Sequence, residues 1–408
     1  MKKVLALVMA ALISLSMAAC GDTSSSAGSV GSRPEASSTA AAAGGALTGT
    51  LKLGFIGPIT GDAALYGTAA ANGAQIAADE INALGTGFTI EYDPRDDEND
   101  AGKSVDAYNA LKERKAQAIV GCVTSASCAA VGAEAYADRM FMLTPSASAA
   151  SVSEGKDNVF RLCTSDTDQG PACAQYIADN ALATKVAVIY NNSDVYSTGI
   201  YNTFAAKADE LGLEIVSVTT FTDDTADDFS VQLTEAQKAG ADLLFLPIYY
   251  TPASLIFRQA DSMGYAPVFF GTDGMDGILS LEGFDTSLAE GAFLLTSFSA
   301  DAADEPAKSF AAGYTKLYGE TPSQFAADGY DCVYAIYYAL TQYAAQNGGY
   351  DVTDVSYAEL CEVLISVFAG DFTYSGLTGE GMTWTAEGEV NKIPGVVVIK
   401  NGTYAGFN

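Results

Sequence analysis

Short apolar runs alternate with longer amphipathic stretches along the chain from residue 51 onward. The apolar runs span three to six residues, and most are unbroken by polar positions, which is typical of strands covered on both faces of a parallel sheet. We therefore predict strands at residues 51–56, 88–92, 118–120, 141–143, 186–190, 214–218, 243–246, 268–270 and 292–296.

The stretches between these runs have helical periodicity. In the first of them, Ile76, Ala77 and Ile81 fall on one face while Asp79 falls away from it. We predict helices at residues 66–84, 102–114, 170–180, 198–211, 253–263, 305–318 and 324–346. Repeated strand–helix units form parallel sheets with helices on both faces, and such sheets bind ligands beyond the carboxyl ends of their strands. The pattern predicts an α/β protein, and 408 residues suit two lobes.

The first fifty residues follow a different pattern. Two lysines precede an apolar run at residues 4–15, which is shorter than the ~20 residues of a membrane-spanning helix. We interpret residues 1–19 as a secretory signal peptide. No other stretch is long and apolar enough to span a bilayer.

The segment after this run predicts a membrane anchor and a spacer. Met17-Ala18-Ala19-Cys20 resembles the lipobox of bacterial lipoproteins, so Cys20 is the expected lipidation site. From residue 21 to 49, 23 of 29 residues are Gly, Ala, Ser or Thr, so residues 20–49 are expected to form a flexible tether.

Composition argues against several classes of function. The chain has 20 Lys and Arg against 50 Asp and Glu, and this net charge of −30 repels nucleic acid and anionic lipid. It contains no histidine, which removes Ser/His/Asp and Cys/His catalytic arrangements and most catalytic zinc sites. Carboxylate pairs such as Asp223/Asp224 and Asp227/Asp228 could support a hydrolase, but they lie in an acidic stretch typical of a solvated loop. We expect a protein without enzymatic activity, cofactor, metal or nucleic-acid partner.

Six cysteines remain beyond Cys20, and an even number outside the cytoplasm permits three disulfides in 15 pairings. Short loops favour the pairs Cys122–Cys128, Cys163–Cys173 and Cys332–Cys361, although all six could stay reduced in a cell that lives without oxygen. None of them has the CxxC spacing of a metal site.

Small and hydroxyl residues follow the predicted strands of the first half. Residues 57–67 (GPITGDAALYG) lead from the first strand into a helix, and the motifs VGCVTSAS and LTPSAS bring Ser125 and Ser148 to the ends of the third and fourth strands. Backbone N–H groups at such junctions are unpaired and the helix dipole is positive, so a carboxylate is the expected guest. A single serine at such a place can equally be an N-cap.

Aromatic and acidic residues follow the strands of the second half. The motifs YNNSDVYSTG, LPIYYTPA and GTDGMDG bring Tyr196, Tyr249 or Tyr250, and Asp273 to one edge. Tyrosines can cover an aliphatic group, and Asp273 could pair with an ammonium, although a loop aspartate is often a turn residue. Anion donors on one lobe and aromatics with a carboxylate on the other are complementary to a zwitterion.

These motifs together resemble a known family. Residues 57–82 (GPITGDAALYGTAAANGAQIAADEIN) resemble the leucine/isoleucine/valine-binding protein family of solute-binding proteins, which serve ATP-driven importers. LTPSAS, SDTDQG, YNNSDVYSTG and FTYSGLTGEGMTW occur in the family's order. The resemblance implies the type I periplasmic-binding-protein fold, in which two doubly wound parallel-sheet lobes joined by a three-stranded hinge close on a ligand.

The resemblance also implies domain boundaries. It places the three crossovers near residues 161–165, 296–300 and 372–378. The N-terminal lobe is then residues 50–163 plus 299–375, and the C-terminal lobe is residues 164–298 plus 376–408.

The site residues are likewise implied by the resemblance. Ser125, Ala147 and Ser148 match positions that hold the ligand carboxylate and part of its ammonium, and Asp273 matches the acid that binds the ammonium. The pocket aromatics are matched by Tyr66, Tyr196 and Tyr249. Asp273 is one methylene shorter than the glutamate often found there, and Ser148 replaces a frequent threonine, so the identity of the solute stays open.

The expected function is capture of an amino acid, branched-chain or similarly aliphatic, for the permease subunits of an ABC importer. The protein is expected to be a monomer outside the cytoplasm, held at the membrane by its lipid anchor only. The alternatives are a sensing module of the same fold that feeds a membrane receptor, and a binder of an amide, urea or aromatic acid. A Gram-positive surface and a Gram-negative periplasm both fit, and the permease is not identified.

Overall fold

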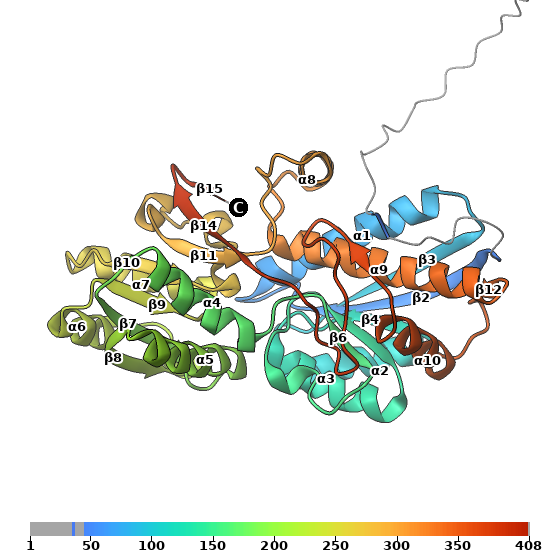
Figure 1. The fold of residues 1–408 in the computed structure, drawn as a ribbon, viewed down its shortest axis with the longest axis horizontal. Coiled ribbons are helices and arrows are strands. Elements are labelled where there is room, and N and C mark those ends of the chain that lie inside the picture. Colours follow the sequence, from blue (N-terminus) through green and yellow to red (C-terminus); the bar gives the residue numbers. More distant parts are fainter. Residues whose placement is uncertain (1–34, 37–44, 407–408) are drawn as a thin grey trace, which may run out of the picture. The chain divides into compact units, whose positions relative to one another are not determined.

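A computed structural model describes residues 35–36 and 45–406 of the chain. The predicted signal peptide, the lipidation site Cys20 and most of the predicted tether lie outside these residues. All nine predicted strands and all seven predicted helices occur in the structure, with ends that differ by a few residues. They form two α/β lobes within residues 31–408 (Figure 1).

The sheet of the first lobe contains six parallel strands. Five of them run in the order β12-β2-β4-β5-β6, and β3 also pairs with β2. The strands are β2 (Leu47–Gly57), β3 (Phe88–Asp96), β4 (Ala118–Gly121), β5 (Phe141–Thr144), β6 (Val159–Arg161) and β12 (Tyr350–Asp351). The helices of this lobe are α1 (Ala64–Ala83), α2 (Ala101–Glu113), α3 (Ser125–Asp138), α8 (Glu305–Tyr318), α9 (Gln324–Gln346) and α10 (Tyr357–Phe368).

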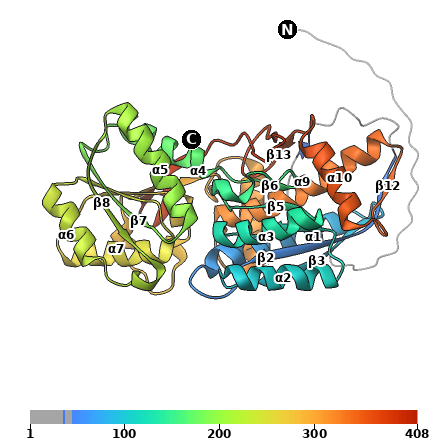
Figure 2. The ribbon, with the colours of Figure 1, turned by 90° about the horizontal axis from the view of Figure 1, so that it is seen from below.

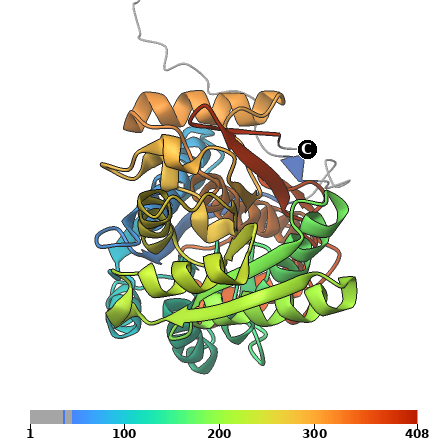
Figure 3. The same ribbon diagram turned by 90° about the vertical axis from the view of Figure 1, so that its left-hand side faces the viewer.

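The sheet of the second lobe has seven strands in the order β15-β14-β11-β10-β9-β7-β8. Five are parallel, and the hairpin of β14 and β15 adds an antiparallel edge, which crosses the second lobe in red in Figure 3. The strands are β7 (Lys185–Asn191), β8 (Glu214–Phe221), β9 (Leu243–Leu246), β10 (Val268–Gly271), β11 (Phe293–Thr296), β14 (Gly395–Lys400) and β15 (Thr403–Ala405). The helices are α4 (Asp166–Asp179), α5 (Val195–Leu211), α6 (Ser230–Ala239) and α7 (Tyr250–Ser262). Figure 2 labels them around β7 and β8.

The central strands are apolar because helices cover both of their faces. Every residue of β4, β5 and β9 is buried, as the unbroken apolar runs predicted. The unpredicted helices α3, α6 and α10 lie on the outside of the sheets, and α3 is built mostly of small residues whose periodicity is weak.

Two glycines set the packing of α1 against α9. A Cβ atom on Gly73 would lie 1.8 Å from the carbonyl oxygen of Ala326, and one on Gly329 would lie 2.1 Å from that of Ala70. Only glycine permits this approach of the two backbones. The two helices therefore pack closely near their N-terminal ends, and the ring centroids of Tyr66 and Phe325 lie 4.5 Å apart.

The third crossover lies later in the chain than the sequence predicted. Trp384 Nε1 donates a hydrogen bond to the backbone oxygen of Arg161 at 2.7 Å, and the Arg161 amide donates to Gly388 O at 3.0 Å. Trp384 also packs on Phe368 and Phe372 of the first lobe. Residues 376–391 therefore belong with the first lobe rather than the second, and the chain crosses over between Val390 and β14.

Two short parts of the predicted tether form strands. β1 (Glu35–Ala36) pairs antiparallel with β13 (Tyr374–Ser375), and β2 begins at the buried Leu47. The first sheet therefore extends further back than the apolar run from residue 51 indicated.

The predicted disulfide pairs are wrong. All six described cysteines are free and buried. The side chains of Cys122 and Cys128 contact each other in an apolar cluster with Met142 and Val131, while burial raises the pKa of the Cys163 and Cys173 thiols. These thiols act as small apolar packing groups, which loop length along the sequence does not reveal.

Candidate functional site

A cavity lies between the two lobes, with about 250 Å³ of empty space when its open mouth is counted. From the first lobe it is lined by Tyr66, Val123, Thr124, Ser125, Ser146 and Phe325, and from the second by Tyr196, Tyr249, Asp273 and Gly274. Several of these residues lie in or beside the first turns of α1, α3, α5, α7 and α9. Five of the seven predicted site residues thus meet in one place.

The acidic side of the cavity is built around Asp273, which follows β10. Its Oδ1 accepts a hydrogen bond from the Tyr196 hydroxyl at 2.7 Å, and its Oδ2 accepts one from Gln169 Nε2 at 2.8 Å. Burial raises the pKa of this carboxyl to about 6, and the two donors act in the opposite direction. At neutral pH the cavity therefore contains a fixed carboxylate, which favours a cationic group on the ligand.

Aromatic rings form the apolar wall. The Tyr66 ring lies edge-on to Tyr249 at 5.4 Å between centroids, and Tyr249 stacks on Tyr196 at 5.1 Å. The Phe325 ring also packs on Tyr66, tilted, with 4.5 Å between centroids. Rings in these orientations offer a rigid, largely apolar surface that suits an aliphatic or flat ligand group.

The opposite side is suited to an anion. α3 begins at Ser125, and its N-cap Thr124 makes no side-chain cap hydrogen bond. Thr124 Oγ1 is buried and has no hydrogen-bond partner among the described residues, although Thr124 lines the cavity. A buried hydroxyl of this kind usually has a partner, so its position beside a helix N-terminus points to a ligand oxygen.

Ala147 lies in the loop after β5, beside the first cavity. This residue is buried in the apolar cluster around Cys122 and Cys128, and its amide donates to Thr144 Oγ1 at 2.9 Å. It does not line the cavity because the loop after β5 turns its methyl group into the core. Its neighbour Ser146 lines the cavity instead, and the Ser146 hydroxyl donates to Val123 O at 2.6 Å.

Ser148 reaches the site through its backbone. Its amide donates to Ser125 Oγ at 3.2 Å, and the amide of Ala149 donates to the same oxygen at 3.2 Å. Its side chain is fully buried and is absent from the cavity lining. The predicted proximity of Ser125 and Ser148 is therefore present, but the Ser148 hydroxyl does not face the cavity.

Sequence reasoning missed Ser146, Phe325 and Gln169. Ser146 and Gln169 belong to the motifs LTPSAS and SDTDQG, whose small and polar residues were the available signal. Phe325 lies on α9, far along the chain from any predicted strand end, and periodicity marks it only as a core residue.

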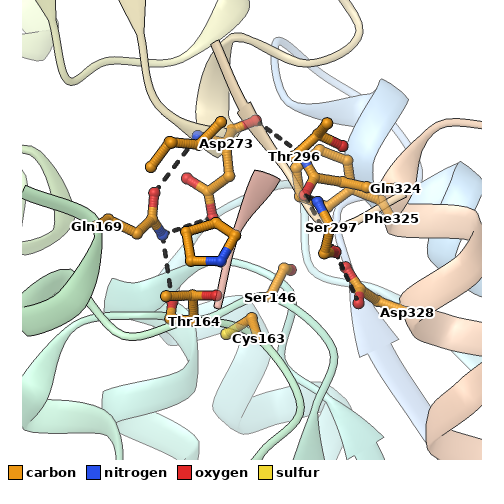
Figure 4. Close-up of a pocket in the computed structure, with 12 residues that line it drawn as sticks. Ser146, Cys163, Thr164, Gln169, Asp273, Thr296, Ser297, Gln324, Phe325 and Asp328 are labelled. Carbon is orange, nitrogen blue, oxygen red and sulfur yellow. Dashed lines mark hydrogen bonds between the residues drawn. The ribbon is translucent and has the colours of Figure 1, made fainter. Parts of the chain in front are cut away.

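A second, hinge-side cavity adjoins the first (Figure 4). It shares Ser146, Asp273 and Phe325 with the first cavity and is also lined by residues of all three crossovers, namely Cys163, Thr164, Thr296, Ser297 and Pro394. Gln324 and Asp328 of α9 complete its polar wall. Asp328 pairs with Lys392 at 2.8 Å, and both side chains are almost fully buried, so an ion pair lies at the hinge.

Direct contacts hold the lobes together beside the first cavity. The Tyr66 hydroxyl donates to Gly274 O and accepts from Tyr250 N at 3.1 Å. The Tyr250 hydroxyl accepts from Leu65 N at 3.3 Å. The cavity is therefore enclosed on this side by hydrogen bonds between the lobes.

No group of three or more His, Cys, Asp or Glu side chains suited to a metal ion occurs among the described residues. Likewise, no helix in the described part is long and apolar enough to cross a membrane.

Comparison with known proteins identifies relatives of this chain. The chain is 30% identical over 229 residues to the Leu/Ile/Val-binding protein BraC3 of Rhizobium johnstonii, a match that covers 55% of this chain and 62% of that protein. The chain thus spans less than two thirds of this relative's length.

Two solved structures resemble the fold over most of its length. One is a leucine-binding protein, LivK, from Thermotoga maritima, with a TM-score of 0.76, 28% identity, and coverage of 88% of this chain and 97% of that one. The other is the branched-chain amino acid transporter substrate-binding protein LivJ from Streptococcus pneumoniae in complex with isoleucine, with a TM-score of 0.77, 28% identity, and coverage of 88% and 98%.

The profile of one protein family, described as periplasmic binding protein, matches residues 50–364. This range contains both sheets apart from the β14–β15 edge and the first three residues of β2, and it contains every residue that lines the first cavity. The two-lobed α/β fold, the cavity between the lobes and this match agree, and the chain belongs to the periplasmic binding protein family.

Proposed function

We propose that this protein captures a small aliphatic amino acid between its lobes and delivers it to an ABC importer. The observation that carries the proposal is the placement of Asp273 on one lobe and of Ser125, at the start of α3, on the other, around one cavity. An α-amino acid has an ammonium for the first and a carboxylate for the second. The names of the matching relatives, which bind leucine, isoleucine and valine, support the same class of ligand.

Before the cost of ordering is subtracted, the contacts open to such a ligand amount to roughly 4.5–12 kcal/mol. A micromolar dissociation constant requires about 8 kcal/mol. Two or three charge-assisted hydrogen bonds contribute roughly 1.5–3 kcal/mol each. Burial of a leucine-sized side chain against Tyr66, Tyr249 and Phe325 adds about 1.5–3 kcal/mol, which offsets part of the ordering cost.

A thermal-unfolding screen of the purified protein against the amino acids tests the proposal. A ligand at 100 times its dissociation constant stabilises the native state by about 2.7 kcal/mol. We expect leucine, isoleucine or valine to raise the melting temperature. If no amino acid or close analogue raises it, the proposed ligand class is wrong.

Substitution of Asp273 tests the site itself. Asp273→Asn keeps the shape of the side chain but removes its charge. We expect amino-acid binding at least about 30-fold weaker, since the loss of one partner of a buried charge pair costs roughly 2–5 kcal/mol. Asp285→Asn is the matched control, because Asp285 lies on the surface of the same lobe and caps a short helix. Equal affinity of wild type and Asp273→Asn would place the ammonium elsewhere.

We further propose that Cys20 carries a lipid, and that this lipid holds the protein at the outer face of the membrane. The protein works there as a monomer and catalyses no reaction. The lipobox-like residues 17–20 support the first point, and the absence of histidine supports the last. In cells, Cys20→Ser should release the protein into the soluble fraction. Continued membrane retention of this variant would contradict lipid anchoring at Cys20.

A further inference from the structure

Arg161, at the end of β6, is a fully buried arginine whose side chain is directed at one loop. Its Nη1 donates to the carbonyl oxygens of Ala147 and Ser148, and its Nη2 donates to Ala149 O at 3.1 Å. Nη2 also donates to Ser153 Oγ at 2.7 Å. A guanidinium has only donors, so three successive carbonyl groups of the loop after β5 point toward it.

The direction of these carbonyl groups determines where the loop amides point. In a trans peptide the C=O of one residue and the N–H of the next point in opposite directions. Because Ala147 O and Ser148 O point toward Arg161, the amides of Ser148 and Ala149 point away from it. Both of these amides donate to Ser125 Oγ, the hydroxyl that lines the cavity.

The charge of Arg161 is balanced from the last segment of the first lobe. Arg161 Nε lies 3.1 Å from Glu389 Oε2, and Glu389 Oε1 accepts a hydrogen bond from Ser153 Oγ at 2.7 Å. The arginine backbone is bonded to Trp384 and Gly388 of the same segment. Burying a charge is costly unless it is paired and hydrogen-bonded, and here the pairing includes the loop that borders the cavity.

We propose that Arg161 is a positioning residue for the ligand carboxylate. By binding the carbonyl oxygens of residues 147–149 behind the loop, it directs the amides of Ser148 and Ala149 at Ser125 Oγ. These two amides hold the Ser125 hydroxyl in the lining of the cavity, where its proton is free to be donated to a carboxylate. Glu389 keeps the guanidinium in place. This inference rests on the proposed function for the identity of the ligand, but the loop geometry that it assigns to Arg161 exists without ligand.

The test uses Arg161→Lys, which keeps the charge but loses the planar fork that contacts three carbonyls. We expect leucine binding, measured by isothermal titration calorimetry, to weaken about 10- to 100-fold, the range of one charge-assisted hydrogen bond. We also expect the backbone ¹H–¹⁵N signals of Ser148 and Ala149 to shift in the unliganded variant. Arg139→Lys is the control, because Arg139 follows α3 in the same lobe and pairs with Asp157 and Glu362 near the surface.

A second variant, Glu389→Gln, tests the same proposal if Arg161→Lys does not fold. The Glu389 side chain is 38% exposed, so Glu389→Gln should fold while weakening the hold on the guanidinium, with about 3- to 10-fold weaker leucine binding and smaller shifts of the same two signals. If wild type binds leucine and the folded variants match it in affinity and in both amide signals, the positioning role is wrong. If wild type binds no amino acid, the proposed function fails, and the unliganded signals of Ser148 and Ala149 still decide the role of Arg161.

Discussion

Removal of the Tyr66 hydroxyl isolates the contribution of lobe closure to ligand binding. In Tyr66→Phe the ring stays in the aromatic wall, but Gly274 O loses its donor and Tyr250 N loses its acceptor, both of them on the other lobe. Each hydrogen bond contributes about 1 kcal/mol net, so the closed arrangement loses about 2 kcal/mol. If the ligand binds the closed arrangement, its dissociation constant rises by about 30-fold.

Isothermal titration calorimetry with leucine measures this effect directly. Tyr265→Phe is a matched control, because the Tyr265 hydroxyl also donates to a backbone oxygen, that of Ala241 at 2.9 Å, but within the second lobe. We expect the control to lower the free energy of unfolding by about 1 kcal/mol and to leave the dissociation constant unchanged. Wild-type affinity in Tyr66→Phe, or an equal loss in Tyr265→Phe, would refute a role for this contact in closure.

Three further predictions concern stability and thiol chemistry. Burial raises the pKa of Asp273 to about 6, above its value in the unfolded chain, so this residue favours folding below the unfolded pKa and loses that contribution as the pH rises through 6. The free energy of unfolding in urea of unliganded Asp273→Asn, relative to wild type, should therefore rise from pH 4 to pH 8. A constant difference would contradict the shift. Lys392→Met should lower the free energy of unfolding by about 3–5 kcal/mol because it leaves Asp328 charged and buried. The double variant Lys392→Met/Asp328→Asn should lose less, and equal losses would show that the broken ion pair does not cause the destabilisation. In a Cys20→Ser chain denatured without reductant, all six remaining thiols should react with a thiol reagent, and fewer would indicate disulfides.

The parallel sheets were predictable because their strands are buried on both faces. The unbroken apolar runs of β4, β5 and β9 can form neither an exposed strand nor an amphipathic helix, so their type and position follow from the sequence. The rule that ligands bind at the carboxyl ends of such strands then brought Ser125, Tyr196 and Asp273 together.

The parts of the fold and of the site that the sequence did not predict depend on contacts between distant segments. Residues 376–391 stay on the first lobe because Trp384 packs against Phe368 and Phe372, and no local pattern encodes that contact. Ala147 and Ser146 are adjacent small residues, and only the turn of the loop, set in part by Arg161, decides which of them faces the cavity. Phe325 is brought to the site by the glycine contacts between α1 and α9.

The late third crossover has a consequence for synthesis of the chain. The first lobe lacks α9, α10 and residues 376–391 until that part of the chain has been made, and the second lobe lacks its β14–β15 edge until residues 395–405 follow. Because these two segments are neighbours in the sequence, a nascent chain completes both lobes within a few dozen residues of each other.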